Sequence, residues 1–234
     1  MKSTDVIKAL AKVANKERAK NSIWYFKTKK DQYGYGDVFI GVTVPEQRKI
    51  AKKFSNLSLS EIQKLLKSKI HEHRLTALFI LTKQFEVGNE ISRAKIVELY
   101  LKNTKHINNW DLVDQSAPRI LGAYLCSKKR EVLYKLVRSK NLWERRIAVL
   151  STLYFIVKAH DFDDTLKISK ILLSDKHDLI HKSVGWMLRE VGKKDENVLT
   201  KFLDEHIKII PRTTLRYAIE KFSETKRQKY LNKI

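Results

Sequence analysis

The stretch HRLTALFIL, residues 73–81, holds a small residue, Ala77, in the middle of an apolar run. Four later stretches repeat this arrangement around Ala117, Ala148, Gly185 and Ala218: DQSAPRIL (114–121), ERRIAVLST (144–152), HKSVGWMLRE (181–190) and LRYAIEKF (215–222). Successive small residues lie 40, 31, 37 and 33 positions apart. Recurrence of one helical pattern at this distance indicates a repeat architecture.

A shorter amphipathic segment precedes each apolar stretch, at 59–67, 90–102, 129–138, 162–173 and 196–208. Two helices per repeat are typical of a HEAT-like or ARM-like α-solenoid, in which antiparallel helix pairs stack and the inner helices line a concave surface. We therefore predict an all-α fold and a single domain over 1–234. Residues 1–57 form its N-terminal helices and an irregular segment, and 58–234 form about five helix pairs.

The N-terminal region departs from the repeat. Residues 1–20 are predicted to form one amphipathic helix, and 29–44 form an irregular segment with three of the seven glycines. Pro45 is expected to open the next helix, where its missing N–H costs nothing. The role of 29–44 stays open, between contact with DNA and closure of one end of the solenoid.

The chain carries 48 Lys and Arg against 26 Asp and Glu, a formal net charge of +22. A protein this basic repels itself, so a polyanionic partner is expected, and nucleic acid is the first choice ahead of membrane surfaces and acidic proteins. A generally lysine-rich proteome is the plain alternative. It explains lysines on outer faces better than arginines at repeated inner positions.

Other classes are excluded by what the sequence lacks. The single cysteine, Cys126, cannot form an intrachain disulfide, and we expect it to be a buried residue of a cytoplasmic protein. The first residues, MKSTDVIKAL, lack the apolar core of a signal peptide, and no apolar run is long enough to span a bilayer, so we expect neither a signal peptide nor a membrane span. No metal-binding or cofactor-binding motif is present, so we expect no metal, no cofactor and a monomer.

The inner helices share surface positions when each is numbered from its small residue. Trp110, Asp114 and Trp186 fall at −7, −3 and +1, which are steps of four that share one helix face. Cationic residues occupy the same or the adjacent column: Arg74, Arg145 and Lys182 at −3, and Arg146 and Arg216 at −2. The sequence thus predicts a basic groove with aromatic side chains, suited to a nucleic-acid backbone.

Structural alternatives stand beside this interpretation. Trp110 and Trp186 could be core residues, and Arg146 could lie over apolar neighbours. Asp114 could complement the helix dipole, the role we assign to Asp111. Pro118 has no N–H for the carbonyl of Asp114, so the helix is expected to bend there.

The chain resembles the AlkD-like family of DNA alkylation-repair glycosylases, which are HEAT-like solenoids. The segments that carry the resemblance are GDVFIGVTVPEQRK (36–49), NNWDLVD (108–114), LWERRIAVL (142–150) and VGWMLREVG (184–192). The resemblance implies that Asp114 is the catalytic carboxylate. It implies that Trp110 and Trp186 flank the sugar and backbone at the lesion, and that Arg146 holds a nearby phosphate. Some relatives lack the aspartate and bind DNA without excision.

The expected function is base-excision repair of double-stranded DNA. The enzyme would hydrolyse the N-glycosidic bond of positively charged N3- or N7-alkylated purines. Asp114 would stabilise the oxocarbenium ion, and no base-flipping pocket is expected. The alternatives are a non-catalytic HEAT-like module that binds damaged or branched DNA, and a scaffold for acidic proteins. The preferred lesion and the tolerance of bulky adducts stay open.

Overall fold

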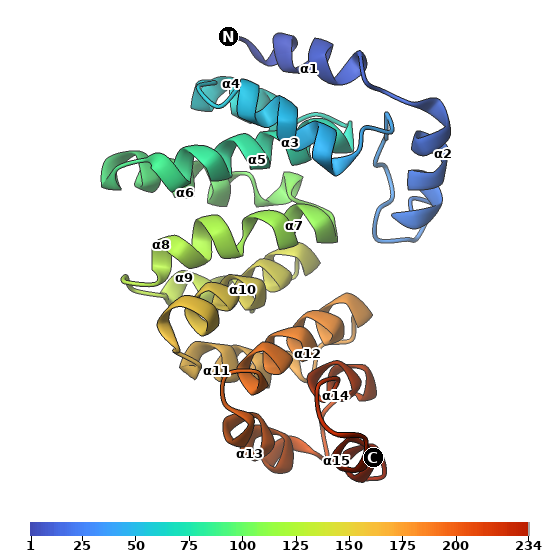
Figure 1. Cartoon of the computed structure of the whole chain (residues 1–234), viewed down its shortest axis with the longest axis vertical. Helices are drawn as coiled ribbons and strands as arrows, with labels where there is room; N and C mark the ends of the chain where they lie inside the picture. The colour runs from blue at the N-terminus through green and yellow to red at the C-terminus, as the bar shows by residue number, and fades with distance from the viewer. Residues whose placement is uncertain (234) are drawn as a thin grey trace. The chain divides into compact units, whose positions relative to one another are not determined.

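The computed structural model describes residues 1–233 and is all-helical in that range, with one isolated bridge between Val38 and Ile70 as its only strand-like pairing. The chain folds into two compact units, Met1–Ser116 and Ala117–Ile234. Among the described residues, no helix is long and apolar enough to cross a membrane. The all-α prediction is confirmed (Figure 1).

The first unit is built around α5. Its helices are α1 (Ser3–Ala11), α2 (Lys16–Tyr25), α3 (Val44–Lys53), α4 (Leu59–Leu66), α5 (His71–Val87), α6 (Glu90–Lys102), the 3₁₀ turn η1 (Thr104–His106) and α7 (Trp110–Ser116). Helix α5 is buried along most of its length because α3, α4, α6 and α7 all pack against it. Its first turn is buried as well, although it is made of polar residues.

The predicted single helix over 1–20 is wrong, because two helices occupy that range. Asn15 ends the run: its side chain caps α2 by accepting the N–H of Arg18 at 2.9 Å, and its own N–H donates to the carbonyl of Ile40 at 2.9 Å. An N-cap asparagine has extended backbone angles that a continuing helix does not allow. The start of α3 is as expected, with Pro45 in its first turn.

The second unit contains the remaining helices. They are the π-helical turn η2 (Pro118–Gly122), α8 (Ala123–Leu125), α9 (Glu131–Leu136), α10 (Leu142–Tyr154), the π-helical turn η3 (Phe155–Ala159), α11 (Asp163–Leu172), α12 (Asp178–Gly192), α13 (Glu196–His206), α14 (Arg212–Ala218) and α15 (Glu224–Leu231). Helix α10 packs between η2 and α12, and α12 packs on α14. The shorter helices α9, α11 and α13 pack against α10 and α12, which confirms the alternation of short and long helices within this unit.

Small residues lie where the longer helices cross. A Cβ added at Gly185 would come within 2.5 Å of the Cβ of Tyr217 and 2.6 Å of the carbonyl oxygen of Thr214, so only glycine fits between α12 and α14. A Cβ added at Gly122 would meet the carbonyl oxygen of Ser151 at 2.2 Å. The predicted alanines are buried too. Cys126 is half-buried, whereas the sequence predicted full burial.

Candidate active site

Helix α7 carries the aspartate and the tryptophan that the sequence analysis singled out. It starts at Trp110 because the buried side chain of Asn109 accepts the N–H of Trp110 at 2.8 Å. Asp114 follows one turn later, so the two side chains share a helix face. Both residues are half-buried, which leaves each of them partly accessible to a ligand.

The indole of Trp110 is held by aromatic neighbours from the N-terminal region. Its ring stacks on Phe26 with centroids 5.5 Å apart and an interplanar angle of 19°, and Tyr25 meets it edge-on at 5.9 Å. Phe26 in turn stacks on Phe39 at 4.9 Å. Offset and edge-on contacts of this kind favour a fixed ring orientation, so Trp110 is a rigid surface beside Asp114.

Two residues after Asp114, buried hydroxyl groups anchor the end of α7. The Tyr100 hydroxyl lies 3.0 Å from Ser116 Oγ, and Ser116 donates to the carbonyl of Leu112 at 2.6 Å. Burial, and then the negative charge of Asp114, raise the pKa of Tyr100 despite its hydrogen bond to Ser116. Tyr100 therefore stays a neutral hydrogen-bonding group in the core beside the carboxylate.

The helix changes its winding directly after this site. Helix α7 ends at Ser116, and Pro118 begins the π-helical turn η2, in which the N–H of Gly122 donates to the carbonyl of Ala117 at 2.9 Å. Pro118 lacks the N–H that would bond the carbonyl of Asp114. The sequence predicted a bend at Pro118, and the structure has a change from α-helical to π-helical winding there. Single π-helical turns of this kind are frequent at functional sites.

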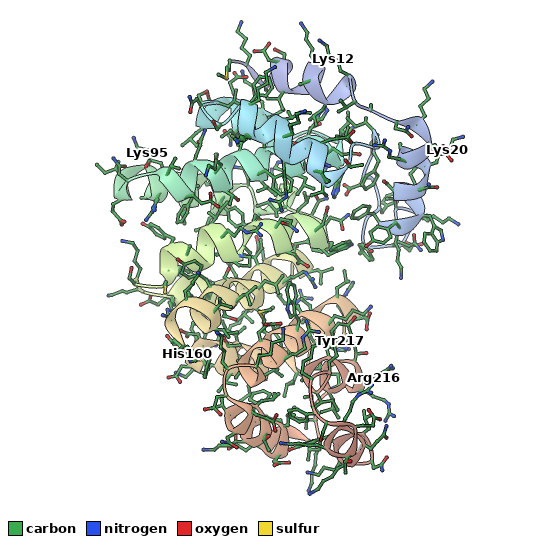
Figure 2. The ribbon with its side chains drawn as sticks, viewed as in Figure 1. Lys12, Lys20, Lys95, His160, Arg216 and Tyr217 are labelled. Atoms are coloured by element: carbon green, nitrogen blue, oxygen red, sulfur yellow. The ribbon has the colours of Figure 1, made fainter. Side chains whose placement is uncertain are left out.

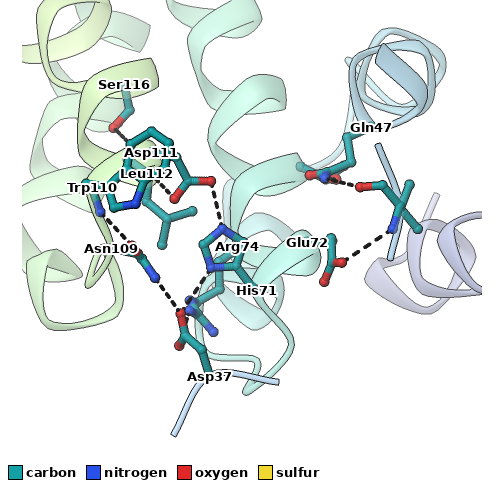
Figure 3. Close-up of polar contacts among 12 residues, drawn as sticks. Asp37, Gln47, His71, Glu72, Arg74, Asn109, Trp110, Asp111, Leu112 and Ser116 are labelled. Atoms are coloured by element: carbon teal, nitrogen blue, oxygen red, sulfur yellow. Dashed lines mark hydrogen bonds and ion pairs between the residues drawn. The ribbon is translucent and has the colours of Figure 1, made fainter. Parts of the chain in front are cut away.

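A buried ion cluster supports α7 from the side of α5 (Figure 3). The His71 ring donates from Nδ1 to Asp37 at 3.0 Å and from Nε2 to Asp111 at 2.8 Å. Asp37 also accepts from Arg74 at 2.6 Å and from the side-chain amide of Asn109 at 3.1 Å. Two carboxylates, one imidazolium and one guanidinium thus neutralise one another inside the first unit.

The environment keeps this cluster charged. Burial alone lowers the pKa of His71, but the Asp111 carboxylate and the hydrogen bond to Asp37 outweigh burial and raise the pKa to about 9. Burial alone raises the pKa of Asp37, but His71 and Arg74 outweigh it and hold the pKa below its ordinary value. Phe39 stacks on the His71 ring at 4.7 Å, which adds a cation–π contact.

This cluster was not predicted from the sequence. The sequence pattern indicated only a helix-dipole role for Asp111 and a position in the groove for Arg74. Asp111 does cap its own helix by accepting the N–H of Leu112 at 2.8 Å, but its other oxygen binds His71. Arg74 is 3% exposed and is held by Asp37, so it faces the protein interior.

The other candidate residues belong to the second unit. Trp186 is half-buried on α12, next to Gly185, and its indole N–H donates to Glu190 at 3.1 Å. Lys182 lies one turn earlier and pairs with Asp178 at 2.7 Å. Arg216 is exposed on α14. The structure thus brings Trp110 and Asp114 together in one unit and gathers the remaining candidates in the other.

The guanidinium group of Arg145 already binds other groups of the protein. Its Nε donates to Asp175 at 2.6 Å, and its Nη1 donates to the carbonyls of Ser139 and Lys140 at 3.0 and 3.1 Å. Its neighbour Arg146 is 5% exposed, and one of its nitrogens donates to the carbonyl of Leu179 at 2.6 Å.

No group of three or more His, Cys, Asp or Glu side chains within residues 1–233 is arranged to hold a metal ion. The candidate site of the first unit consists of the half-buried Asp114 carboxylate and the aromatic surface of Trp110. Such a combination can stabilise a developing positive charge next to a polyanion.

A sequence model of a known family matches residues 6–222, and it is described as DNA alkylation repair enzyme. The chain belongs to the DNA alkylation repair enzyme family. Among proteins with curated functions, no sequence matches this chain.

Two solved structures of similar proteins cover nearly the whole molecule. A predicted DNA alkylation repair enzyme from Enterococcus faecalis is 17% identical, with a TM-score of 0.70 over 90% of this chain and 97% of that one. AlkD2 from Streptococcus mutans is 15% identical, with a TM-score of 0.56 over 95% of this chain and 97% of that one. At these identities the likeness shows a shared all-α fold.

Proposed function

We propose that this protein is a DNA glycosylase of base-excision repair that removes positively charged N3- and N7-alkylated purines from double-stranded DNA. The observation that carries the proposal is the pairing of Asp114 with Trp110 on α7, where both side chains are half-buried and one turn apart. Membership in the DNA alkylation repair enzyme family supports DNA as the substrate.

The chemistry asks little of the protein. An N3- or N7-alkylated purine already carries a positive charge, so it departs without a general acid. The bonding electrons of the N-glycosidic bond return to the base, and the sugar becomes an oxocarbenium ion at C1′. Asp114 stabilises that cation and orients the water that attacks C1′, as carboxylates do in glycoside hydrolases. The faces of Trp110 and Trp186 attract the same cation.

Basic residues hold the surrounding phosphates in this proposal. Lys182 and Arg216 act on the DNA backbone. Arg145 is given a structural role because Asp175 and two carbonyls already bind it. Arg146, which the sequence assigned to a phosphate, is given a structural role as well, because it is 5% exposed and donates to the carbonyl of Leu179. For the whole chain we propose a HEAT-like solenoid with one basic groove, in which the lesion is attacked from its backbone side and no base-flipping pocket is needed.

The test measures release of methylated bases from methylated duplex DNA by the wild type and by Asp114→Asn. We expect Asp114→Asn to excise the base at least about 100-fold more slowly than the wild type, which is the size of effect seen when an electrostatic catalytic group is removed. DNA binding should persist. Asp163→Asn is the matched control, because its side chain is 82% exposed on α11. Normal excision by Asp114→Asn contradicts the assignment, and binding without release by the wild type favours a non-catalytic DNA-binding module.

Specificity gives a second readout. Duplexes with one cationic lesion are compared with duplexes that carry one neutral lesion at the same position. A neutral base is a poor leaving group without a general acid, so we expect release of the cationic base only. Equal rates on the two duplexes would overturn the proposed mechanism.

A further inference from the structure

Helices α12, α14 and α15 enclose a polar pocket of about 360 Å³ in the second unit. It is lined by Asp178, Lys182, Thr213, Arg216, Tyr217, Glu220 and Arg227. Helix α14 packs closely on α12 at Gly185, where an added Cβ would collide with Tyr217, which also lines the pocket. Arg216 and Tyr217 extend from the surface of α14 in Figure 2.

The two carboxylates of the pocket are already neutralised. Asp178 pairs with Lys182 at 2.7 Å, and Glu220 pairs with Arg189 and, at 3.3 Å, with Lys221. Burial alone raises the pKa of Asp178, but Lys182 outweighs it and holds the pKa below its ordinary value. Both carboxylates therefore belong to existing ion pairs, and neither is available to attract a cation.

The two arginines, in contrast, have donors to spare. Arg216 is exposed and makes no hydrogen bond or ion pair with any residue of the described range 1–233. Arg227 binds Glu224 through Nη1 at 3.2 Å, but its Nε is buried without an acceptor. A buried N–H without an acceptor is unfavourable, so an acceptor that reaches Arg227 is stabilised there.

We propose that this pocket holds a single backbone phosphate of duplex DNA between Arg216 and Arg227. Guanidinium groups bind phosphate oxygens through paired N–H donors, and two of them on one polar pocket form a site for a tetrahedral oxyanion. The DNA source rests on the proposed function, whereas free inorganic phosphate shares the same chemistry.

This pocket includes a residue outside the column of cations that the sequence predicted at positions −3 and −2 of the repeat. That column placed Lys182 and Arg216 on separate helices and gave no role to Arg227, which lies on the last described helix. The structure joins all three around one pocket. Arg216 and Arg227 are therefore expected to act as one contact and to fail together.

The first experiment measures how binding of an undamaged duplex depends on salt. Each phosphate contact contributes about 0.9 to the slope of log K against log salt concentration. We expect Arg216→Gln and Arg227→Gln each to lower the slope by about 0.9, and the double variant to lower it by the same amount. A double variant that loses about 1.8 shows two separate phosphates, and unchanged slopes show none; either result overturns the proposal.

Arg138→Gln is the matched control for these variants. It removes the same charge from the same unit, but Arg138 is exposed at the end of α9, outside the pocket, and donates to the carbonyl of Tyr134 at 2.7 Å. Its slope should equal that of the wild type. A fall as large as that of Arg216→Gln would mean that net charge, and not the pocket, sets the slope.

The second experiment does not depend on DNA. The side-chain Nε–H resonances of Arg216 and Arg227 are followed by NMR while inorganic phosphate is added to the full chain. We expect both to shift along one saturable curve while Arg138 stays in place. If neither resonance shifts, the pocket is not an oxyanion site. If both shift but the salt slopes stay unchanged, the pocket binds free phosphate and the DNA assignment falls.

The two proposals can fail separately. A chain that shows the predicted slopes but releases no methylated base keeps the phosphate pocket and loses the glycosylase function. A chain that releases bases with slopes unaffected by Arg216→Gln and Arg227→Gln keeps the function and loses the pocket.

Discussion

His71 lies between two carboxylates that reach it from distant parts of the chain. Asp37 comes from the segment before α3 and Asp111 from the first turn of α7, so one imidazolium ties both to α5 (Figure 3). A buried ion pair stabilises a fold less by its net energy than by the large cost of leaving one partner alone. His71 is therefore needed to keep Asp111, and with it the start of α7, in place.

This arrangement predicts how stability depends on pH. The folded state raises the pKa of His71 from 6.5 to about 9, so its contribution is complete below pH 6.5 and is lost as the pH rises through 9. We expect the free energy of unfolding, measured with urea, to fall by on the order of 3 kcal/mol between these pH values. His71→Gln should be less stable by about 3–5 kcal/mol at pH 6.5 and should lose most of this pH dependence.

His160→Asn provides the control for this titration. His160 is exposed and has a left-handed backbone with φ of 53°, which asparagine tolerates. Its unfolding should follow the pH curve of the wild type. A His71→Gln protein that keeps the full loss of stability between pH 6.5 and 9 would show that another group is responsible.

The sequence could not predict this cluster because its members share no period. Asp37 and Asp111 lie 34 and 40 positions from His71, and helical spacing relates residues only within one helix. The placement of Trp110 and Asp114 on one helix face could be predicted because the two residues are four positions apart in one helix. The stacking of Phe26 on Trp110 is again a contact between distant segments, visible only after folding.

Between helices, one arginine contact occurs twice. Arg74 on α5 and Arg145 on α10 each occupy the position three before the small residue, and each donates to the carbonyls five and six residues earlier and to an aspartate. The repeated contact joins the start of each longer helix to the end of the segment before it. The cations that the sequence analysis placed in a groove thus fasten the repeat at these two positions.

For Arg145 this predicts a loss of stability and not of DNA affinity. Arg145→Met removes hydrogen bonds from a charged group, each worth about 1.5–3 kcal/mol, so we expect the free energy of unfolding to fall by about 2–4 kcal/mol. The folded variant should bind undamaged duplex DNA within about twofold of the wild type at one salt concentration. Thermal unfolding and fluorescence anisotropy measure the two quantities.

Asp175→Asn tests the pairing itself. Because Asp175 accepts from Arg145 at 2.6 Å, the double variant should lose less stability than the sum of the two single variants. Additive losses would show that the pair is not coupled. A large loss of DNA affinity in Arg145→Met with unchanged stability would return Arg145 to the DNA contact.

The bounds of a helix could be predicted where local sequence signals set them. The prediction failed where a contact between distant segments sets them. The shorter helices α4, α6, α9, α11 and α13 begin and end within a few residues of the predicted segments, because apolar periodicity indicates their bounds. Pro118 indicated a change in the helix after α7, but the sequence did not predict that the following turn is π-helical. The break at Asn15 depends on a hydrogen bond to Ile40, which no local pattern contains.

At the scale of the whole molecule, residues proposed to contact DNA lie in each compact unit. Trp110 and Asp114 belong to the first unit, and Trp186 and the phosphate pocket belong to the second. The net charge of +22 favours association with any polyanion, but it does not explain recognition of a lesion. The proposal therefore requires that DNA contact elements of each unit.

Amide hydrogen exchange can test this requirement directly. The Asp114→Asn protein is expected to bind duplex DNA with a cationic lesion without releasing the base, so the complex persists during the measurement. We expect slower exchange in α7 and in α12 with the same dependence on DNA concentration, because binding to the native state stabilises the elements that it contacts. Helix α13, to which the proposal assigns no DNA contact, serves as the internal reference. Slower exchange confined to one unit would contradict the proposal that residues of each unit contact DNA.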